Sequence, residues 1–156
     1  MHSPDSIKQV AEFHSTFQHP ILPEPTIPHE KRCNLRVELL AEELKELQQA
    51  IKDNDMVEIA DALCDLQYVL SGAILEFGLG SQFKTLFDEV HRSNMSKACE
   101  NEAEALATIA HYEKNYNTKA YFKVIEGKYL VYREEDNKTL KSINYSPADL
   151  KSMLNK

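Results

Sequence analysis

The spacing of hydrophobic and polar residues predicts helices through the N-terminal half of the chain. Apolar side chains recur every three or four residues between Asp5 and Phe17, which indicates a short amphipathic helix. Four prolines follow within residues 19–28, and because they remove backbone donors we expect an extended segment there, called the strap. Residues 29–53 contain neither Gly nor Pro and are rich in Leu, Glu, Lys and Gln, which predicts one long helix.

The next segment completes a helical hairpin. Asn54-Asp55 predicts a turn, and a second long helix is expected from Met56 to Phe77, closed by Gly78-Leu79-Gly80. Because the connection is so short, the two long helices should run antiparallel and lie side by side.

The C-terminal half has a mixed pattern. Helices are predicted over 81–97, with Ser81 as the cap, and over 101–116. Two aromatic and β-branched runs, 121–125 and 129–133, flank a Glu-Gly-Lys turn, which is typical of a β-hairpin.

Ser146-Pro147 should cap and open a last short helix that runs from Ala148 to Leu154. Together these elements predict an all-α fold, a helical bundle completed by oligomerisation, with a small C-terminal β-hairpin appendage. We expect a helical catalytic core over residues 1–98 and a helix plus β-hairpin appendage over 99–156. Oligomerisation is expected because the two long helices carry apolar residues on more sides than this short chain can cover.

The negative charge is concentrated in the helical hairpin. The chain carries 25 acidic and 18 basic residues, a formal net charge of −7. Nine acids and only two bases, Lys45 and Lys52, lie between Glu38 and Asp65, so this stretch alone has a balance of −7 and the remainder is neutral. An acidic protein repels phosphate backbones, so we do not expect nucleic-acid binding as its main function. A bound divalent cation would reverse that repulsion for a small anion.

Helical spacing places these acids on two faces that can converge. Three glutamates share one side of the first long helix: Glu42, Glu43 and Glu46. Three acids share a narrow arc of the second: Glu58, Asp61 and Asp65. The opposite side of the first helix is apolar and carries Val37, Leu40, Leu44, Leu47 and Ile51. So many facing carboxylates would repel one another without a counter-charge, and carboxylate sets of this kind suit Mg²⁺ or Mn²⁺.

A second interpretation is an ordinary solvated face, stabilised by ion pairs within each helix, such as Glu42 with Lys45. A single glutamate on a helix usually has that role. For the two helices together, the shortage of bases favours the metal site.

The acids also form a motif that resembles a family signature. Glu42-Glu43-x-x-Glu46 followed by Glu58-x-x-Asp61 is similar to the EExxE…ExxD signature of the all-α nucleoside triphosphate pyrophosphohydrolase superfamily, the MazG-like and phosphoribosyl-ATP pyrophosphohydrolase-like proteins. The segments 87–97 and 144–150 resemble the phosphoribosyl-ATP pyrophosphohydrolase-like branch. Three segments in the same order are more specific than the acid motif alone.

The resemblance implies a helical bundle assembled by oligomerisation and Mg²⁺-dependent hydrolysis of a nucleoside triphosphate between its α and β phosphates. The products would be the monophosphate and pyrophosphate. Carried over by position, the metal ligands would be Glu43, Glu46, Glu58 and Asp61. Glu42 would hold a further metal or orient the attacking water, and Asp65 is added as a ligand from the helical wheel alone.

The chain departs from the commoner pattern of the family in two places. Many relatives have a Glu at the position of Ala62, so the metal-binding pair on the second helix is less certain than the match suggests. The stretch 99–118 looks inserted relative to the family pattern, so the substrate preference of the family does not carry over directly to this chain.

Five polar residues outside the acid motif are candidate phosphate contacts: Arg92, Asn94, Lys97, Arg133 and Lys141. A solvated helix end, or an exposed strand, is the alternative for each of them. Tyr145 or the His19-Pro20 pair could contact a base, although packing and surface positions are commoner roles for such residues.

No run of 18 apolar residues and no basic stretch followed by an apolar one is present, so we expect neither a membrane span nor a secretion signal, and place the protein in the cytoplasm. Three widely spaced cysteines fit reduced thiols. The leading hypothesis is a Mg²⁺-dependent nucleotide pyrophosphohydrolase that acts as a homodimer or homotetramer on a nucleoside triphosphate or a phosphoribosyl nucleotide. The rivals are a catalytically reduced nucleotide- or metal-binding module of the same fold and an acidic helical adaptor.

Overall fold

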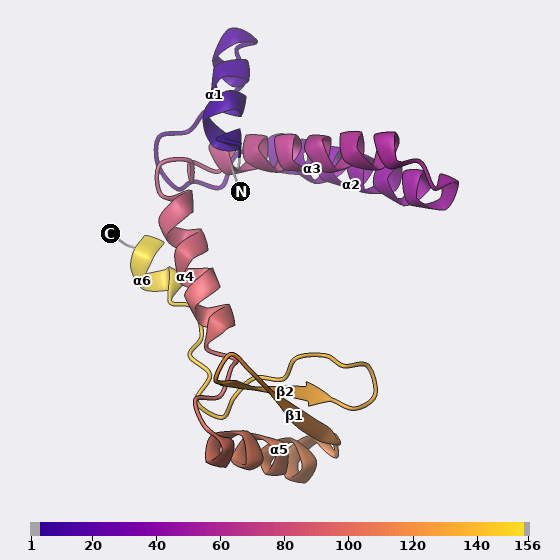
Figure 1. The fold of residues 1–156 in the computed structure, drawn as a ribbon. Coiled ribbons are helices and arrows are strands. Elements are labelled where there is room, and N and C mark those ends of the chain that lie inside the picture. The colour runs from indigo at the N-terminus through magenta and orange to yellow at the C-terminus, as the bar shows by residue number, and fades with distance from the viewer. Residues whose placement is uncertain (1–3, 155–156) are drawn as a thin grey trace. The chain divides into compact units, whose positions relative to one another are not determined.

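The computed structural model describes residues 4–154, and its contacts divide the chain into two compact units, Met1–Phe83 and Lys84–Lys156. The described residues are mostly helical, with a two-stranded antiparallel sheet near the C-terminus (Figure 1). This confirms the predicted helical fold and its small hairpin. The predicted division into a catalytic core over residues 1–98 and an appendage over 99–156 stays a prediction. None of the described helices has the length and apolar character needed to cross a membrane.

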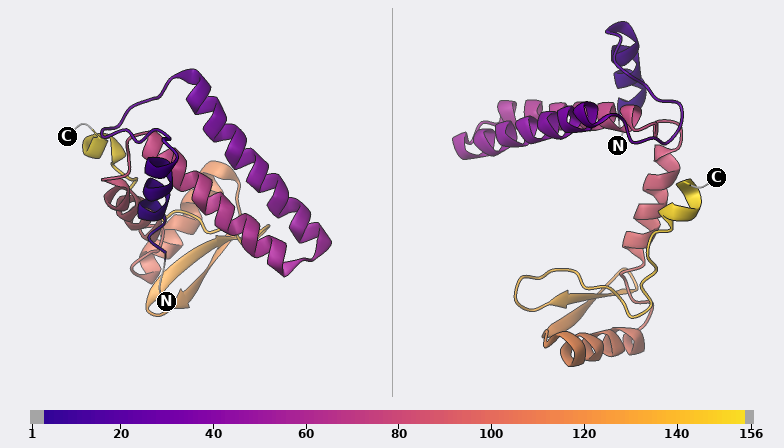
Figure 2. Two further views of the ribbon diagram at one scale, coloured as in Figure 1. Left: turned by 90° about the horizontal axis from the view of Figure 1, so that it is seen from above. Right: turned by 180° about the vertical axis from the view of Figure 1, so that it is seen from behind.

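The centre of unit 1 is an antiparallel hairpin of α2 (Glu30–Asp53) and α3 (Met56–Glu76), as predicted (Figure 2). Asn54 adopts the left-handed conformation with φ 53°, which ends α2. Asp55 then caps α3, because its carboxylate accepts hydrogen bonds from the backbone N–H groups of Val57 at 2.9 Å and Glu58 at 3.2 Å.

α1 (Ser6–Thr16) packs against α3, and the strap connects it to α2. The strap is non-helical, as expected, and two backbone hydrogen bonds fix it to the end of α3. Leu22 N–H donates to the Leu75 carbonyl at 3.0 Å, and Thr26 N–H donates to the Phe77 carbonyl at 3.1 Å. A Cβ at Gly78, whose φ is 68°, would lie 1.8 Å from a strap carbonyl oxygen, so only glycine permits this approach.

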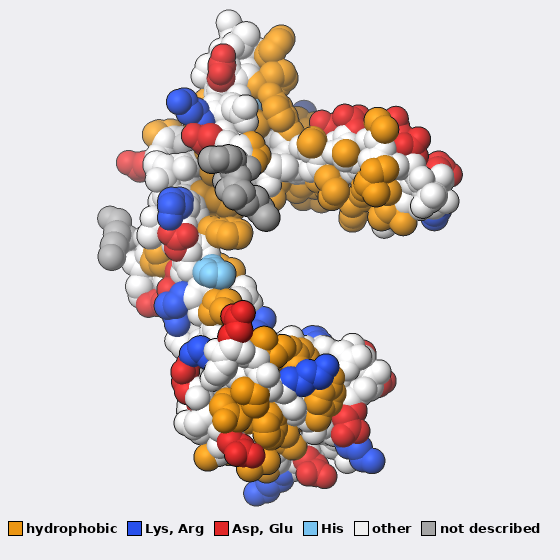
Figure 3. Space-filling view, viewed as in Figure 1, with side chains coloured by type: hydrophobic (Ala, Val, Ile, Leu, Met, Phe, Trp, Pro, Cys, Tyr) orange, Lys and Arg blue, Asp and Glu red, His pale blue; other side chains and the backbone are white. Residues whose placement is uncertain are grey.

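One face of the hairpin is apolar and exposed, and we call it the hydrophobic face. Six large apolar residues at seven-residue intervals are exposed there: Val37, Leu44 and Ile51 in α2, and Met56, Leu63 and Leu70 in α3. Figure 3 shows hydrophobic side chains over the side of this hairpin turned to the viewer and acidic ones along its edge. The predicted apolar side of α2 is therefore only partly covered within one chain. A seven-residue interval is typical of helices that pack against other helices.

α4 (Phe83–Met95) begins two residues after the predicted start. Ser81 does not cap it, because Gln82 N–H donates to the Leu79 carbonyl at 3.2 Å and this hydrogen bond places Ser81 inside a turn.

The rest of unit 2 packs α5 (Glu102–Tyr116) against a hairpin of β1 (Ala120–Ile125) and β2 (Lys128–Arg133). The register pairs Ala120 with Arg133 and Ile125 with Lys128, and the two turn residues between the strands both have positive φ, as a tight hairpin requires. The buried core of this unit consists of Cys99, Ala105, Val131 and Leu140. All three cysteines of the chain are free thiols.

α6 (Leu150–Leu154) begins later than predicted, and Ser146-Pro147 does not open it. The Asp149 carboxylate accepts from the Ser152 backbone N–H at 3.2 Å and so occupies the capping position. The Ser146 hydroxyl instead accepts from Arg92 Nη1 at 3.0 Å, which holds this segment against α4. The prediction was wrong because a tertiary hydrogen bond competes with the local capping signal.

Candidate functional site

An open groove between α2 and α3 collects the acids of the predicted motif, and we call it the acid groove. A cavity of about 240 Å³ has five carboxylates on its lining: Glu46, Asp53, Asp55, Glu58 and Asp61. Ala50 and Ala62, 5% and 3% exposed, also line it. The structure therefore brings Glu46 of α2 beside Glu58 and Asp61 of α3, as helical spacing predicted. Ala62 is buried on the same lining, and its methyl group offers no ligand atom to an ion.

Glu43 is half-buried and belongs to the same group of acids. Burial raises the pKa of Glu43, and the negative charges of Glu46, Asp65, Glu42 and Asp61 raise it further. Asp65, which was added from the helical wheel alone, is among the acids whose charge raises the pKa of Glu43. Charge repulsion that reaches from α3 to α2 means that the two acid faces converge.

The six carboxylates of the predicted motif have no partner in the described part of the chain. No hydrogen bond or ion pair reaches the side-chain oxygens of Glu42, Glu43, Glu46, Glu58, Asp61 and Asp65. Lys45 forms no ion pair in the described chain either, so the expected pair of Glu42 with Lys45 is not formed, and five of the six acids are exposed. Carboxylate oxygens are the ligands that Mg²⁺ and Mn²⁺ prefer. Within residues 4–154, no three acidic, His or Cys side chains are yet close enough together to hold an ion.

A second charged cluster, which sequence analysis missed, lies in the same hairpin and is called the Glu76 centre. Glu76 is 1% exposed, and its carboxylate pairs with the guanidinium groups of both Arg32 and Arg36. Arg32 Nε donates to Glu76 Oε2 at 3.0 Å. Burial alone would raise the pKa of Glu76, but the hydrogen bonds from the two arginines outweigh it and lower the pKa. One signal was available: a single Glu inside an apolar helix end, with two Arg one turn apart upstream.

His14 joins the Glu76 centre from α1. His14 Nδ1 lies 2.9 Å from the Pro20 carbonyl oxygen, which fixes it as the donor, so Nε2 can accept from Arg36 Nη2 at 3.2 Å. Burial lowers the pKa of His14, the Pro20 hydrogen bond opposes this, and the charge of Arg36 lowers it further. Gly72 leaves the space for this contact, because a Cβ there would lie 2.7 Å from Arg36 Nη1 and 3.1 Å from His14 Nε2.

All five predicted phosphate contacts lie in unit 2, and four of them have polar partners within the chain. Arg92 forms a bidentate pair with Glu89, both bonds at 2.7 Å, and this pair lowers the pKa of Glu89 to about 2. Lys97 Nζ donates to Asn94 Oδ1 at 2.7 Å. Arg133 pairs with Asp136. These side chains stay predicted phosphate contacts, and binding would have to replace the present partners.

The fifth, Lys141, lies beside α4 although it is 44 residues from Lys97. Ser142 N–H donates to the Lys97 carbonyl at 3.2 Å, which brings Lys141 to the end of that helix. Lys141 Nζ lies 4.4 Å from the centre of the Tyr145 ring, in a cation–π contact. The Tyr145 hydroxyl is within 2.9 Å of Ser93 Oγ, so packing is the role that the structure gives Tyr145.

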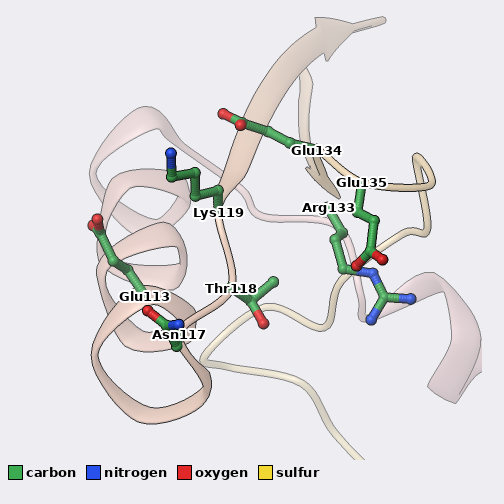
Figure 4. Close-up of a pocket in the computed structure, with 7 residues that line it drawn as sticks. All are labelled: Glu113, Asn117, Thr118, Lys119, Arg133, Glu134 and Glu135. Atoms are coloured by element: carbon green, nitrogen blue, oxygen red, sulfur yellow. The ribbon is translucent and has the colours of Figure 1, made fainter.

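Arg133 also lines a cavity of about 480 Å³ between the end of α5 and the hairpin, shown in Figure 4. Three glutamates share this lining, Glu113, Glu134 and Glu135, against Lys119 and Arg133. Figure 4 shows the Arg133 guanidinium directed away from Lys119 and Glu134. Acids outnumber bases here, so the cavity does not favour a phosphate group.

Comparison with known proteins agrees with the acid motif. Residues 10–94, more than half of the chain, match the phosphoribosyl-ATP pyrophosphohydrolase family. The chain belongs to this family. The match includes α2, α3 and most of α4, and therefore the acid groove and the Glu76 centre. This confirms the resemblance seen in the sequence, and pyrophosphohydrolase activity on a nucleotide is the activity that the family suggests.

A relative of the chain is the uncharacterised protein L479 of Acanthamoeba polyphaga mimivirus. The two are 25% identical over 85% of this chain and 89% of the relative. The likeness covers more of the chain than the family match does, so it includes part of unit 2.

Proposed function

We propose that the protein is a Mg²⁺-dependent nucleotide pyrophosphohydrolase that cleaves a nucleoside triphosphate, or a phosphoribosyl nucleotide, between its α and β phosphates. The observation that carries this proposal is the set of motif carboxylates without a counter-charge on the facing helices, of which Glu46, Glu58 and Asp61 line the acid groove. Carboxylates without a counter-charge repel one another, so a hard divalent cation is the ligand that would stabilise this arrangement most. Membership of the phosphoribosyl-ATP pyrophosphohydrolase family supports the same activity.

The donor set fits Mg²⁺ or Mn²⁺ in chemistry, because every candidate is an oxygen ligand. Glu43, Glu46, Glu58 and Asp61 would hold the ion, with Asp65 as a further ligand opposite Glu43. When bound there, the ion would neutralise phosphate oxygens and lower the pKa of a water molecule. The side chains are free to rotate toward a shared ion, since five of the six are exposed and none is held by a hydrogen bond in the described chain.

The reaction consumes one water molecule for each anhydride that breaks. The water oxygen bonds to one phosphorus atom as the α–β bridging oxygen leaves with the other, giving nucleoside monophosphate, pyrophosphate and a proton. Glu42, at the edge of the acid groove, would orient the attacking water and accept its proton. Lys97 and Lys141, both in unit 2, stay proposed phosphate contacts.

The hydrophobic face supports a homodimer or homotetramer. Its six exposed apolar residues repeat every seven positions in both helices, a pattern suited to helix-to-helix packing between chains. The cytoplasmic location expected from the sequence stays a prediction.

The experiment that tests the function is product analysis by ³¹P NMR with a panel of nucleotides and Mg²⁺. We expect monophosphate and pyrophosphate in equal amounts, and no turnover after chelation of the metal. Release of orthophosphate alone, or no product from any nucleotide, would contradict the proposal.

A catalytically reduced binding module is the second candidate, favoured by Ala62 in place of the Glu that many relatives carry. Glu46→Gln distinguishes the two candidates, with Glu38→Gln as the matched change on the same helix outside the groove. For an enzyme, only Glu46→Gln abolishes turnover while both variants stay folded. For a module, neither the native chain nor either variant turns over, although nucleotide binding persists.

A further inference from the structure

A second cavity in unit 1 is not used by the proposed reaction, and we call it the aromatic pocket. Its volume is about 400 Å³, within the range of small-molecule sites. It lies among α1, the strap, α2 and α3, with Phe13, His19, Leu35, Leu39, Tyr68 and Val69 on its walls. The walls are almost entirely apolar or aromatic side chains, so the ligand must offer a large apolar surface.

The aromatic rings that line the pocket contact one another. Phe13 meets Tyr68 edge-on, with ring centres 5.6 Å apart at 82°, and lies nearly parallel to His19 at 5.7 Å. Phe13 and Tyr68 keep 37% and 39% of their surface exposed. Two large aromatic side chains that stay this accessible at a cavity offer free ring surface for a planar ligand to stack on.

The aromatic pocket and the acid groove are built on the same two helices. Leu39 in its wall is four residues before Glu43, and Val69 is four residues after Asp65. Four residues of helix correspond to about 6 Å, and side chains at this spacing lie on the same face. A molecule whose ring occupied the pocket would therefore have its attached groups within about one helical turn of Glu43 and Asp65.

The floor of the pocket carries a surplus positive charge. Arg32 and Arg36 face one carboxylate, Glu76, and His14 Nε2 lies 3.2 Å from Arg36 Nη2. Arg36 is 7% exposed, and its Nε is a buried side-chain nitrogen without a hydrogen-bond partner in the described chain. Guanidinium groups only donate, so the pocket suits a ring that bears acceptor atoms.

From these observations we infer that the aromatic pocket binds the base of the nucleotide, with Phe13 and Tyr68 as specificity-determining residues that stack on it. A planar ring with nitrogen and oxygen acceptors, joined to a metal-binding phosphate chain, matches the pocket, its arginines and the adjacent acid groove together. This assignment rests on the proposed function for the identity of the attached group. The base itself can be tested without metal or turnover.

The test uses the full chain in the presence of a chelator, with nucleoside monophosphates as probes and saturation-transfer NMR as the readout. We expect saturable binding in which the base protons receive more saturation than the ribose protons. Tyr68→Ala should weaken binding at least fivefold, because it removes a stacking surface. Tyr68→Phe keeps the ring and should bind within twofold of the native chain, since no hydrogen bond holds the Tyr68 hydroxyl in the described structure.

Tyr116→Ala is the matched control, because Tyr116 is 64% exposed and lies in α5 of unit 2. It should bind like the native chain, and thermal unfolding of each variant checks that the fold is kept. Equal affinity of Tyr68→Ala and the native chain, or saturation confined to the ribose, would overturn the assignment. So would a change of oligomeric state in Tyr68→Ala without loss of base binding, since that would make the pocket a contact between copies.

The two proposals fail in different ways. Base-dependent binding to the pocket without any nucleotide hydrolysis would keep the pocket and overturn the proposed function. Hydrolysis at equal KM by the native chain and Tyr68→Ala would keep the function and overturn the pocket.

Discussion

The acid groove and the Glu76 centre are built from the same two helices, yet their carboxylates have opposite surroundings. Glu76 is buried and bonded by two arginines, which hold its pKa below the usual value. Glu43 is half-buried, has no cationic partner, and has its pKa raised by burial and by four neighbouring acids. One hairpin thus contains a neutralised carboxylate and a group of carboxylates that repel one another.

The comparison separates structural acids from functional ones. A buried carboxylate that stabilises a fold needs its counter-charge in the same chain, as Glu76 has. A group that lacks a counter-charge is a site where an external cation gains most by binding. The sequence has the same division. The stretch from Glu38 to Asp65 alone balances at −7, the net charge of the chain, and Arg32, Arg36 and Glu76 all lie outside that stretch.

The largest expected effect on stability is that of Glu76→Gln. The change leaves Arg32 and Arg36 without an anion in a buried site, and breaking a buried pair in this way costs about 3–5 kcal/mol. Urea denaturation followed by circular dichroism measures the free energy of unfolding. Asp88→Asn, which breaks an exposed pair with Lys84, is the control and should have little effect. A loss no greater than that of the control would mean that the Glu76 centre does not stabilise the hairpin.

The same substitution, Glu to Gln, at position 43 should leave stability intact and reduce activity. Glu43→Gln removes one of several repelling charges, so the free energy of unfolding should be unchanged or higher. The kcat for nucleotide hydrolysis should fall about 100-fold or more, as expected when a metal ligand is lost. Steady-state kinetics and denaturation of one preparation measure both quantities. A destabilised variant, or one that keeps full activity, would remove the contrast with Glu76.

Gly72→Ala should have an intermediate effect on the Glu76 centre. The added methyl group would lie 2.7 Å from Arg36 Nη1, and Arg36 can move only by disturbing its contacts with Glu76 and His14. Overpacking of this kind costs about 1–3 kcal/mol. Differential scanning calorimetry should show a lower Tm for Gly72→Ala than for the native chain. An unchanged Tm for Gly72→Ala would mean that Arg36 can rearrange freely.

The smallest predicted effect is a pH dependence from His14. Its pKa is lowered in the folded chain, so between that value and about 6.5 the unfolded chain binds a proton that the folded chain does not. The stabilising contribution of neutral His14 is complete above pH 6.5 and is lost as pH falls, with a slope of at most about 1.4 kcal/mol per pH unit.

His14→Gln should reduce that slope, because the amide can donate to Pro20 and accept from Arg36 without titrating. Urea denaturation between pH 5 and pH 7 gives the slope for both chains, and His91→Gln, at an exposed position, is the control. An equal slope in His14→Gln and the native chain would show that His14 is not the titrating group.

Features set by local sequence could be predicted, and features set by distant contacts could not. The bounds of α2, α3 and α5 lie within one residue of the predicted ones, because they depend on residues within one helical turn. That Glu46 of α2 lines one cavity with Glu58 and Asp61 of α3 follows from helical periodicity and the short turn between the helices.

Contacts between segments far apart were missed for the same reason. Glu76 pairs with arginines 40 and 44 residues away, and no local pattern fixes which acid an arginine will meet. The aromatic pocket depends on how α1 and the strap pack on the hairpin. His19 lines it because of that packing, which no local sequence pattern predicts. The start of α6 was predicted wrongly because Ser146 bonds to Arg92 instead of to its own helix.

The measurement that tests the central claim most directly is a Mn²⁺ titration of the native chain, followed by the electron paramagnetic resonance signal of the free ion. The unpartnered carboxylates predict saturable binding, lost in the Glu43→Gln, Asp61→Asn double variant and kept in Glu38→Gln. Binding that does not saturate, or that is equal in the native chain and the double variant, would contradict the metal site on which the proposed reaction depends.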